Sequence, residues 1–206
     1  MRSYKEQIES KYKKIAKLPE RWLSFTEPIR KEAIGYLQLS NGSSVIDVGC
    51  GTGASFPFLE DVVGEKGKIV GIEPSTSMIA VARDRVKNAG WKNIFLYENT
   101  IEEMDESTQY DGALLFAMHD VFNSPEGLKK IHLLLKDGAH LVCVGPKLQD
   151  HGFIKILNPM LKLLFKRMAL SQENRDKPWR FVAGVFTTEK IIEEKQGLIF
   201  IYVGCK

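Results

Sequence analysis

A glycine-rich loop directly after a buried strand is the feature that most restricts how this chain can fold. Residues 45–56 read VIDVGCGTGASF, so Gly49, Gly51 and Gly53 follow an apolar run that contains one acid, Asp47. Glycines at such a point let the backbone turn sharply and lie close to a ligand that side chains would hold away. A loop of this kind between a strand and a helix indicates an α/β fold with a ligand at the loop.

Apolar strands and amphipathic helices alternate from about residue 44 to residue 146. The strands are almost continuously apolar, as strands are when helices cover both faces of a parallel sheet. This order predicts an α/β fold, a parallel sheet with right-handed crossovers and helices on both faces. The expected strands are 43–49, 67–73, 93–99, 110–118 and 139–146, and the expected helices between them are 54–64, 74–90 and 124–138.

The two ends of the chain depart from this alternation. Helical spacing predicts helices over 3–18 and 29–39, before the first strand. An irregular helical stretch, 147–186, follows the fifth strand. A terminal hairpin then has a charged arm, 187–196, and an apolar arm, 197–205. The charged arm is typical of an exposed edge strand and the apolar arm of a strand between two neighbours.

Length and composition fit one folded domain over residues 1–206. The chain is 44% hydrophobic and 27% charged, which argues against disorder, and its net charge of +3 gives no argument for a nucleic-acid partner. Cys50, Cys143 and Cys205 are odd in number and widely spaced, and no two histidines have metal-ligand spacing. We therefore expect neither a disulfide framework nor a metal site.

No signal peptide or long apolar run is present, so a cytoplasmic protein is expected.

The glycine loop satisfies two ligand templates. From Gly49 it reads G-x-G-x-x-A, a dinucleotide fingerprint with Glu73 downstream for a ribose, and from Asp47 it reads D-x-G-x-G-x-G. The absence of a following Gly-Lys-Ser/Thr excludes a P-loop. Asp47 would repel a pyrophosphate but attract a cationic ligand, and we expect no second substrate domain of the kind a dehydrogenase needs. A nicotinamide dehydrogenase is therefore the weaker alternative.

Three stretches together resemble one family. VIDVGCGTG, GIEPSTSMIAVAR and LKDGAHLVCVGPK look like a class I S-adenosylmethionine-dependent methyltransferase, near the quinone and lipid methyltransferases that act on small molecules. The resemblance covers roughly residues 30–146 well and the end of the chain more loosely. It implies a Rossmann-like, seven-stranded sheet of order 3-2-1-4-5-7-6 with the last strand antiparallel. It also implies an N-terminal helical lid, 1–40, and a helical substrate cover, 147–186.

The resemblance also implies roles for individual residues. The glycines would lie against the cofactor, S-adenosylmethionine, with S-adenosylhomocysteine as the product. Asp47 would lie near the cofactor's methionine end, and Glu73 would accept hydrogen bonds from both ribose hydroxyls. The residues implied to bind the cofactor are Asp47, Gly49, Cys50, Gly51, Thr52, Gly53, Glu73, Pro74, Ser75, Met78, Asn99, Thr100, Phe116 and Ala117.

The acceptor side is less determined by the sequence. His119 and Asp120 follow the fourth strand, and we expect His119 either to remove a proton from the acceptor or to orient it. Asp120 would orient His119 or pair with a cationic acceptor. Residues 153–170 are very apolar yet basic, which leaves two interpretations open. They could form a wall over a lipophilic acceptor with a peripheral membrane contact, or a helix packed on the sheet.

The sequence thus predicts a monomeric or homodimeric enzyme that methylates a small molecule by in-line displacement, with a lipophilic acceptor as a hypothesis. Two alternatives remain open. A nucleic-acid methyltransferase is disfavoured because the chain lacks an Asn/Asp-Pro-Pro-Tyr/Phe tetrad. The second alternative is a protein that binds the cofactor without catalysis. An intact glycine loop argues that the cofactor binds, but it gives no evidence that a methyl group is transferred.

Overall fold

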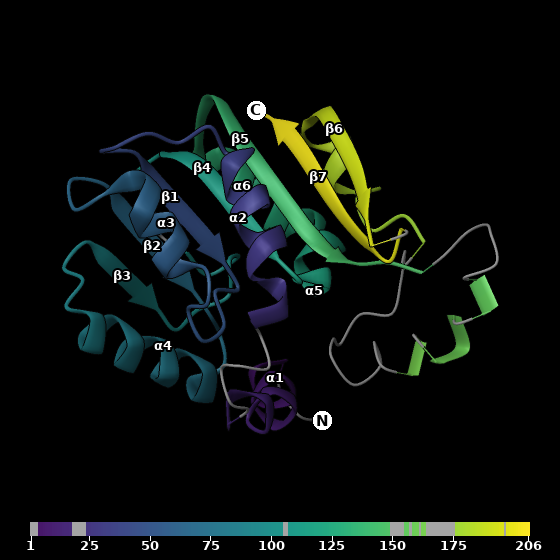
Figure 1. The fold of residues 1–206 in the computed structure, drawn as a ribbon, viewed down its shortest axis with the longest axis horizontal. Helices are drawn as coiled ribbons and strands as arrows, with labels where there is room; N and C mark the ends of the chain where they lie inside the picture. Colours follow the sequence, from purple (N-terminus) through teal and green to yellow (C-terminus); the bar gives the residue numbers. More distant parts are fainter. Residues whose placement is uncertain are drawn as a thin grey trace.

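A seven-stranded mixed sheet forms the centre of the molecule in the computed structural model (Figure 1). The strand order is β3-β2-β1-β4-β5-β7-β6, which confirms the order implied by the resemblance. Five strands run parallel, and β7 pairs antiparallel with both β5 and β6. The structure describes residues 4–17, 24–104, 107–148, 155–156, 158–160, 162–163, 176–195 and 197–206. The strands are β1 (Ser44–Val48), β2 (Lys68–Ile72), β3 (Ile94–Tyr97), β4 (Tyr110–Phe116), β5 (Leu135–Pro146), β6 (Thr187–Glu194) and β7 (Ile199–Cys205).

Helices cover both faces of this sheet, as the alternation predicts. Apolar side chains of α2, α3 and α4 pack on one face, and those of α5 and α6 pack on the other. The helix ends follow the sequence signals, since Ser75 and Ser124 each accept a hydrogen bond from a backbone N–H of the first turn. The helices are α1 (Tyr4–Tyr12), α2 (Glu27–Gly35), α3 (Phe56–Val63), α4 (Thr76–Ala89), α5 (His119–Phe122) and α6 (Pro125–Leu134).

Several boundaries differ from the predictions for physical reasons. The helix expected over 124–138 ends at Leu134, because Leu135 pairs with Tyr110 and already begins β5. Gly138, expected to stop that helix, lies within β5 at a φ of +79°. The short helix α5 was not predicted, because four residues are too few to show a helical period.

The terminal segments are less regular than predicted. The helix expected over 3–18 ends at Tyr12 and is followed by a 3-10 turn, Ile15–Lys17. A second turn, Ser24–Thr26, leads into α2. In residues 176–186, the last part of the helical stretch expected over 147–186, the helix is only the 3-10 turn Val182–Gly184. In Figure 1, α1 lies beyond the carboxyl ends of the parallel strands.

Half of the expected substrate cover, 147–186, lies outside the described residues. Three apolar side chains of its described part, Ile156, Met160 and Leu163, are 69%, 62% and 60% exposed. These three side chains do not pack on the sheet, and most of residues 153–170, for which two interpretations were left open, lie outside the described residues. In the part of the chain that the structure describes, no helix has the length and hydropathy to cross a membrane.

Candidate functional site

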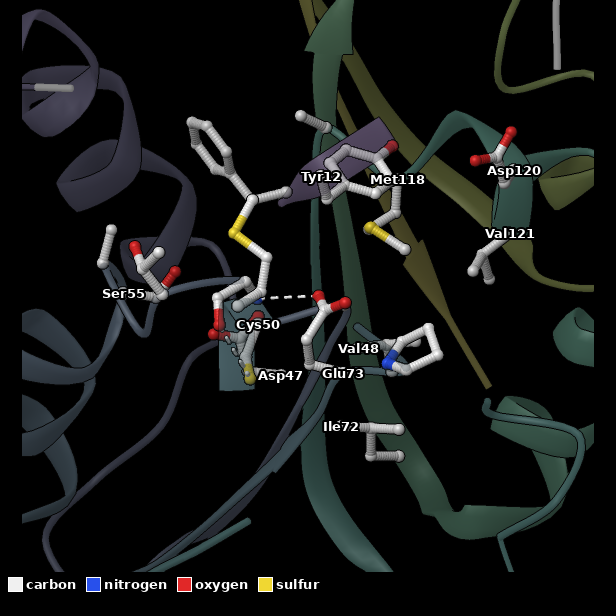
Figure 2. Close-up of a pocket in the computed structure, with 18 of the residues that line it drawn as sticks. Tyr12, Asp47, Val48, Cys50, Ser55, Ile72, Glu73, Met118, Asp120 and Val121 are labelled. Carbon is white, nitrogen blue, oxygen red and sulfur yellow. Dashed lines mark hydrogen bonds between the residues drawn. The ribbon is translucent and has the colours of Figure 1, made fainter. Parts of the chain in front are cut away.

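A pocket of about 930 Å³ opens at the carboxyl ends of the parallel strands (Figure 2). Loops at the carboxyl ends of adjacent parallel strands are where open α/β sheets bind ligands. The pocket wall includes every residue predicted for the site except Gly53 and Ser75. The predicted residues in the wall are Asp47, Gly49, Cys50, Gly51, Thr52, Glu73, Pro74, Met78, Asn99, Thr100, Phe116, Ala117, His119 and Asp120.

The glycine loop turns back onto the end of β2. The backbone N–H groups of Gly49 and Cys50 both donate to the carbonyl of Ile72, over 2.7 and 3.0 Å. Gly49 has a φ of +71°, and a Cβ on it would overlap the side chain of Met118. At Gly51, with a φ of +57°, a Cβ would meet no protein atom within 4 Å, since that side faces the pocket. At Gly51 the loop thus presents bare backbone to the pocket.

Gly53 and Ser75 are corrections to the predicted cofactor wall. A Cβ on Gly53 would lie 2.5 Å from the ring of Phe56, so this glycine packs against α3 and does not line the pocket. Ser75 is fully buried, and its hydroxyl caps α4 by accepting from the N–H of Met78. Both residues shape the elements that carry the pocket.

Glu73, directly after β2, is held in place by two backbone donors. Its Oε2 accepts from the N–H of Gly51 over 3.1 Å and its Oε1 from the N–H of Ser75 over 2.8 Å. The side chain is only 6% exposed. Burial raises the pKa of Glu73 to about 7, against the lowering effect of these two hydrogen bonds. Each carboxylate oxygen keeps lone pairs that can accept from a bound ligand.

Asp47 is a buried acid near the end of β1. It is 1% exposed, and neither of its carboxylate oxygens has a hydrogen-bond partner of normal geometry among the residues that the structure describes. Burial raises its pKa to about 7, and the nearby charge of Arg30 and the Ser55 hydroxyl oppose that rise. A buried carboxylate with so little hydrogen bonding is costly unless a ligand supplies a donor or a further positive charge. This environment fits an ammonium group.

Arg30 is a site residue that the sequence prediction missed. Its guanidinium donates to the hydroxyl of Ser55 over 2.6 Å and lies 3.7 Å from the centroid of the Phe116 ring. Burial lowers its pKa to about 10, while Asp47 raises it, so Arg30 remains charged at neutral pH. A signal was available, since Arg30 shares the buried face of α2 with Ala33 and Ile34, at helical spacing. A lone charge on such a face indicates a functional environment.

The carboxylate of Glu9 attaches the helix α1 to the pocket rim. Glu9 accepts from the hydroxyl of Ser75 over 2.9 Å and from the N–H of Ser77 over 3.1 Å, and it also accepts from the Ser77 hydroxyl. These donors lie at the start of α4, where the helix dipole favours a negative charge. Two other residues of α1, Ile8 and Tyr12, line the pocket.

His119 and Asp120, the first residues of α5, also line the pocket. In Figure 2, Ser55, which binds Arg30, and Asp120 lie on opposite sides. The Nε2 atom of His119 lies 2.8 Å from the carbonyl oxygen of Pro146, so Nε2–H donates there. A Cβ on Gly145 would lie 2.9 Å from the His119 ring, so the glycine gives this ring its space.

The end of β4 is strained next to this ring. Ala117 has a φ of +63°, a region that residues with a side chain rarely adopt, and its N–H donates to the carbonyl of Val144 over 2.6 Å. Such strain tends to occur where function dictates the backbone path. Phe116 and Met118, on either side of Ala117, both line the pocket.

Comparisons with known proteins agree with this geometry. The model of the family described as "Methyltransferase domain" matches residues 39–194. Demethylmenaquinone methyltransferases are similar, at 27% identity in Listeria welshimeri (56% of this chain, 50% of the relative) and 30% in Shouchella clausii (68% and 59%). This chain thus spans about half the length of the curated relatives it matches first. A SAM-dependent methyltransferase structure from Aquifex aeolicus aligns with a TM-score of 0.63 at 20% identity, covering 98% of both chains.

Proposed function

Given that the chain belongs to the class I S-adenosylmethionine-dependent methyltransferase family, we propose that it transfers the cofactor's methyl group to a small lipophilic acceptor. One observation carries the proposal. A single pocket joins a charged wall, with Asp47, Glu73 and the glycine loop, to an apolar wall with Ile8, Tyr12 and Val121. The first wall suits a charged nucleoside, and the second suits an apolar molecule beside it.

The charged wall fits the two ends of the cofactor. Asp47 and Arg30 would hold the amino and carboxylate groups of its methionine part, because the two side chains offer opposite charges in a poorly solvated site. Glu73 would accept from the ribose hydroxyls. Pro74, Met78 and Asn99 would border the adenine. When bound, the cofactor supplies a methyl group on a positively charged sulfur.

His119 is the residue that we propose for proton removal from the acceptor. Because Nε2–H donates to the carbonyl of Pro146, the neutral ring carries its lone pair on Nδ1. A neutral imidazole with a fixed ring is the form that a general base requires. Phe122 and Phe200 pack against the ring and hold its orientation, with centroids 5.2 and 6.3 Å away. Asp120 lines the same wall, where it would contact the acceptor.

The acceptor class rests on the apolar wall and on the names of the relatives. Demethylmenaquinone is a quinone with a long apolar chain, and the relatives that methylate it share the matched region with this chain. In this chain the apolar wall also includes Tyr12, Phe25 and Met118, whose side chains are flat or flexible apolar groups. A reduced quinone with an apolar tail is therefore the first acceptor to test.

The test compares two acceptors that differ only in their tail. Purified protein is given labelled S-adenosylmethionine with a prenylated naphthoquinol, or with the same naphthoquinol without its prenyl chain, and methyl transfer is measured. We expect turnover with the prenylated compound at a kcat/KM at least tenfold higher. Equal turnover of both would contradict a lipophilic acceptor. Binding of S-adenosylhomocysteine without transfer to any acceptor would favour the non-catalytic alternative.

A substitution at His119 separates a role in proton removal from a role in cofactor binding. His119→Gln should lower kcat for the quinol by at least about 100-fold if the ring accepts a proton, since general-base catalysis typically contributes a factor of about 10² to 10⁴. Its affinity for S-adenosylhomocysteine should stay within about twofold of wild type, because the ring lies on the acceptor wall. An unchanged kcat would leave His119 as a packing residue.

We also propose that the described part of the substrate cover contacts an anionic lipid surface. Ile156, Met160 and Leu163 are spaced as one face of a helix, all three are exposed, and Lys155 and Lys162 lie beside them. Serine at all three apolar positions should reduce co-sedimentation with vesicles containing phosphatidylglycerol. Leu133→Ser removes an equally exposed leucine from α6 and should have no effect. Equal losses in both variants would contradict the lipid contact.

A further inference from the structure

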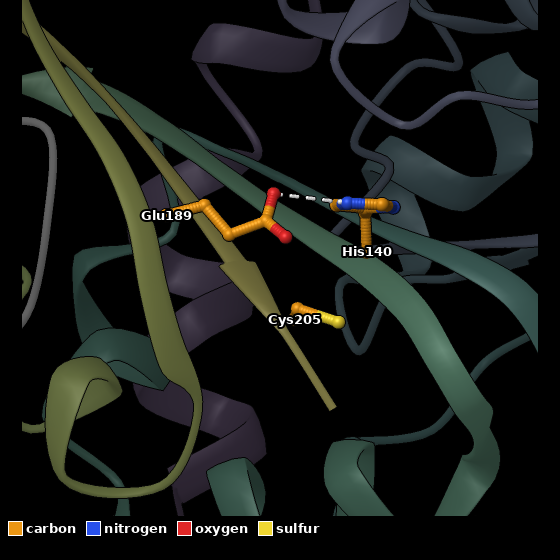
Figure 3. A group of neighbouring side chains, drawn as sticks. All are labelled: His140, Glu189 and Cys205. Atoms are coloured by element: carbon orange, nitrogen blue, oxygen red, sulfur yellow. Dashed lines mark hydrogen bonds and ion pairs between the residues drawn. The ribbon is translucent and has the colours of Figure 1, made fainter.

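Three side chains with metal-binding atoms meet at the end of the sheet away from the pocket (Figure 3). They are His140 of β5, Glu189 of β6 and Cys205 of β7. Their ligand atoms all lie within 4.8 Å of one another. His140 and Glu189 are joined directly, with Nε2 and Oε2 3.0 Å apart. This cluster lies outside the pocket wall and plays no part in the proposed methyl transfer.

The strand register explains why these side chains meet. His140 pairs with Cys205, and Cys205 pairs with Thr187, so residues of three adjacent strands lie in one row. Directly paired residues on neighbouring strands place their side chains on the same face of a sheet. The register between β6 and β7 shifts between Thr188 and Lys190, which marks a bulge at Glu189. A bulge redirects a side chain, and here it brings a carboxylate to the row.

Two polar groups approach His140 Nε2, and in the present orientation of the Gln38 amide they make opposite demands on it. This nitrogen lies 3.0 Å from Oε2 of Glu189, which needs an N–H donor, and 3.3 Å from the amide Nε2 of Gln38, which needs an acceptor. One ring nitrogen carries either a proton or a lone pair and cannot meet both needs. A cation that binds the lone pair would draw in the carboxylate. A half turn of the Gln38 amide would then present its oxygen instead.

We propose that His140, Glu189 and Cys205 form a Zn²⁺ site, with the amide oxygen of Gln38 beside its fourth position. Imidazole, thiolate and carboxylate are the ligand types that Zn²⁺ takes in proteins, and a four-coordinate tetrahedron is its usual structural arrangement. Bonds of about 2.0–2.3 Å place tetrahedral ligand atoms roughly 3.3–3.8 Å apart. A small inward movement of side chains from the present spacing reaches that geometry.

Binding of Zn²⁺ at this site requires the loss of the Cys205 thiol proton. Burial, together with the charge of Glu189, raises the pKa of the Cys205 thiol, so the thiol is protonated at neutral pH without a cation. Binding of Zn²⁺ forms a sulfur–zinc bond and releases the thiol proton to solvent, with no change of oxidation state. The site would tie the edge strand β6 to β7 and β5, and it would stabilise the folded chain without entering the methyl-transfer chemistry.

The sequence prediction of no metal site considered only short spacings. The three ligands are separated by 49 and 16 residues along the chain (189 − 140 and 205 − 189). No local pattern marks such a set, because it is the antiparallel register that assembles it.

Cobalt titration tests the proposal, because Co²⁺ bound to a thiolate has a charge-transfer band in the near ultraviolet. The full chain should bind one Co²⁺ with that band, and Zn²⁺ should displace it. Cys205→Ser should abolish the band, and His140→Gln and Glu189→Gln should each weaken Zn²⁺ binding at least tenfold. Glu194→Gln changes a carboxylate on the same strand outside the cluster and should leave binding unchanged.

Two results would overturn the site. One is a charge-transfer band that persists in Cys205→Ser, which would place the ion on Cys50 or Cys143. The other is the absence of stoichiometric Zn²⁺ binding to the wild-type chain at about 10 μM. Circular dichroism of each variant establishes that it is folded. A Zn²⁺-dependent rise in melting temperature that is lost in Cys205→Ser and kept in Glu194→Gln would support the site independently of the cobalt spectrum.

Discussion

The charged wall of the pocket comes mainly from the ends of β1 and β2, whereas the apolar wall comes largely from segments outside the sheet. Asp47 and Glu73 are fixed by strands whose register is set on both sides, and Arg30 is added to them from α2. Ile8, Tyr12 and Phe25 come from α1 and the turns before α2, and Val121 comes from the short helix α5. The two acids of one wall are therefore placed by the sheet itself, and the other wall is placed by segments packed against the sheet.

This difference predicts how the two walls respond to substitution. A change on the charged wall removes a group that has no substitute nearby, so cofactor affinity should fall steeply. A change on the apolar wall alters shape more than charge, so it should shift the choice of acceptor.

Glu73→Ala should weaken binding of S-adenosylhomocysteine by about 100-fold, as measured by calorimetry. The variant loses the acceptor for the ribose hydroxyls and leaves the N–H groups of Gly51 and Ser75 without their carboxylate. Hydrogen bonds to a charged group contribute about 1.5–3 kcal/mol each, which makes a loss of this size reasonable. Glu98→Ala removes a carboxylate just after the neighbouring strand and should have little effect. Similar losses in both variants would contradict the ribose role.

Arg30→Met should weaken S-adenosylhomocysteine binding by about 20-fold, because it removes the positive charge proposed for the carboxylate of the ligand. The comparison ligand is methylthioadenosine, which has the nucleoside and no amino-acid end. Its affinity should not change if Arg30 acts on the carboxylate. Equal weakening of both ligands would instead show that Arg30 supports the wall through Ser55 and Phe116.

The same contrast explains how much the sequence could predict. The two acids Asp47 and Glu73 and the glycine loop were accessible, because they lie at fixed offsets from strands that are themselves visible as apolar runs. The strand order was implied by the resemblance to the methyltransferase family, and the structure confirms it. Gly53 and Ser75 were placed in the wall although they support it from behind. Residue spacing gives the position along a loop and does not say which side of the loop faces the ligand.

Other parts of the site depend on contacts between distant segments. Arg30 reaches the pocket because α2 packs on the sheet beside Phe116, and Glu9 reaches α4 across more than 60 residues of chain. Short elements such as α5 carry no periodic signal, although they place His119. These features follow from tertiary packing, which local patterns do not contain.

Binding and stability should respond to pH in opposite directions. Burial raises the folded-state pKa of Asp47 to about 7, above its value in an unfolded chain, so the folded form holds a proton that the unfolded form loses. The stability contributed by this proton is complete at low pH and is lost as pH rises through about 7. Glu73 acts in the same direction. The unliganded protein should therefore melt at a lower temperature at pH 8 than at pH 6.

Ligand affinity should rise over the same interval. An ammonium group pairs with the ionised form of Asp47, so S-adenosylhomocysteine should bind about tenfold more tightly at pH 8 than at pH 6, as expected for one carboxylate with a pKa near 7. Asp47→Asn removes this titration, and its affinity should be lower and less dependent on pH. A wild-type affinity that is flat between pH 6 and pH 8 would contradict the ammonium contact.

Glu9→Ala should speed dissociation of S-adenosylhomocysteine by about fivefold, with a smaller effect on equilibrium affinity than either change on the charged wall. Burial alone would raise the pKa of Glu9, but hydrogen bonds from Ser77 and Ser75 outweigh it and lower the pKa, so the carboxylate is ionised at neutral pH. It holds α1 against the first turn of α4, and without it α1 should open more often. Stopped-flow displacement measures the rate, and Glu6→Ala, an exposed acid on the same helix, is the control. Equal rates in both variants and wild type would show that α1 does not gate the pocket. A faster rate in Glu9→Ala alone would show that a segment outside the sheet controls release of the ligand from a wall that the sheet builds.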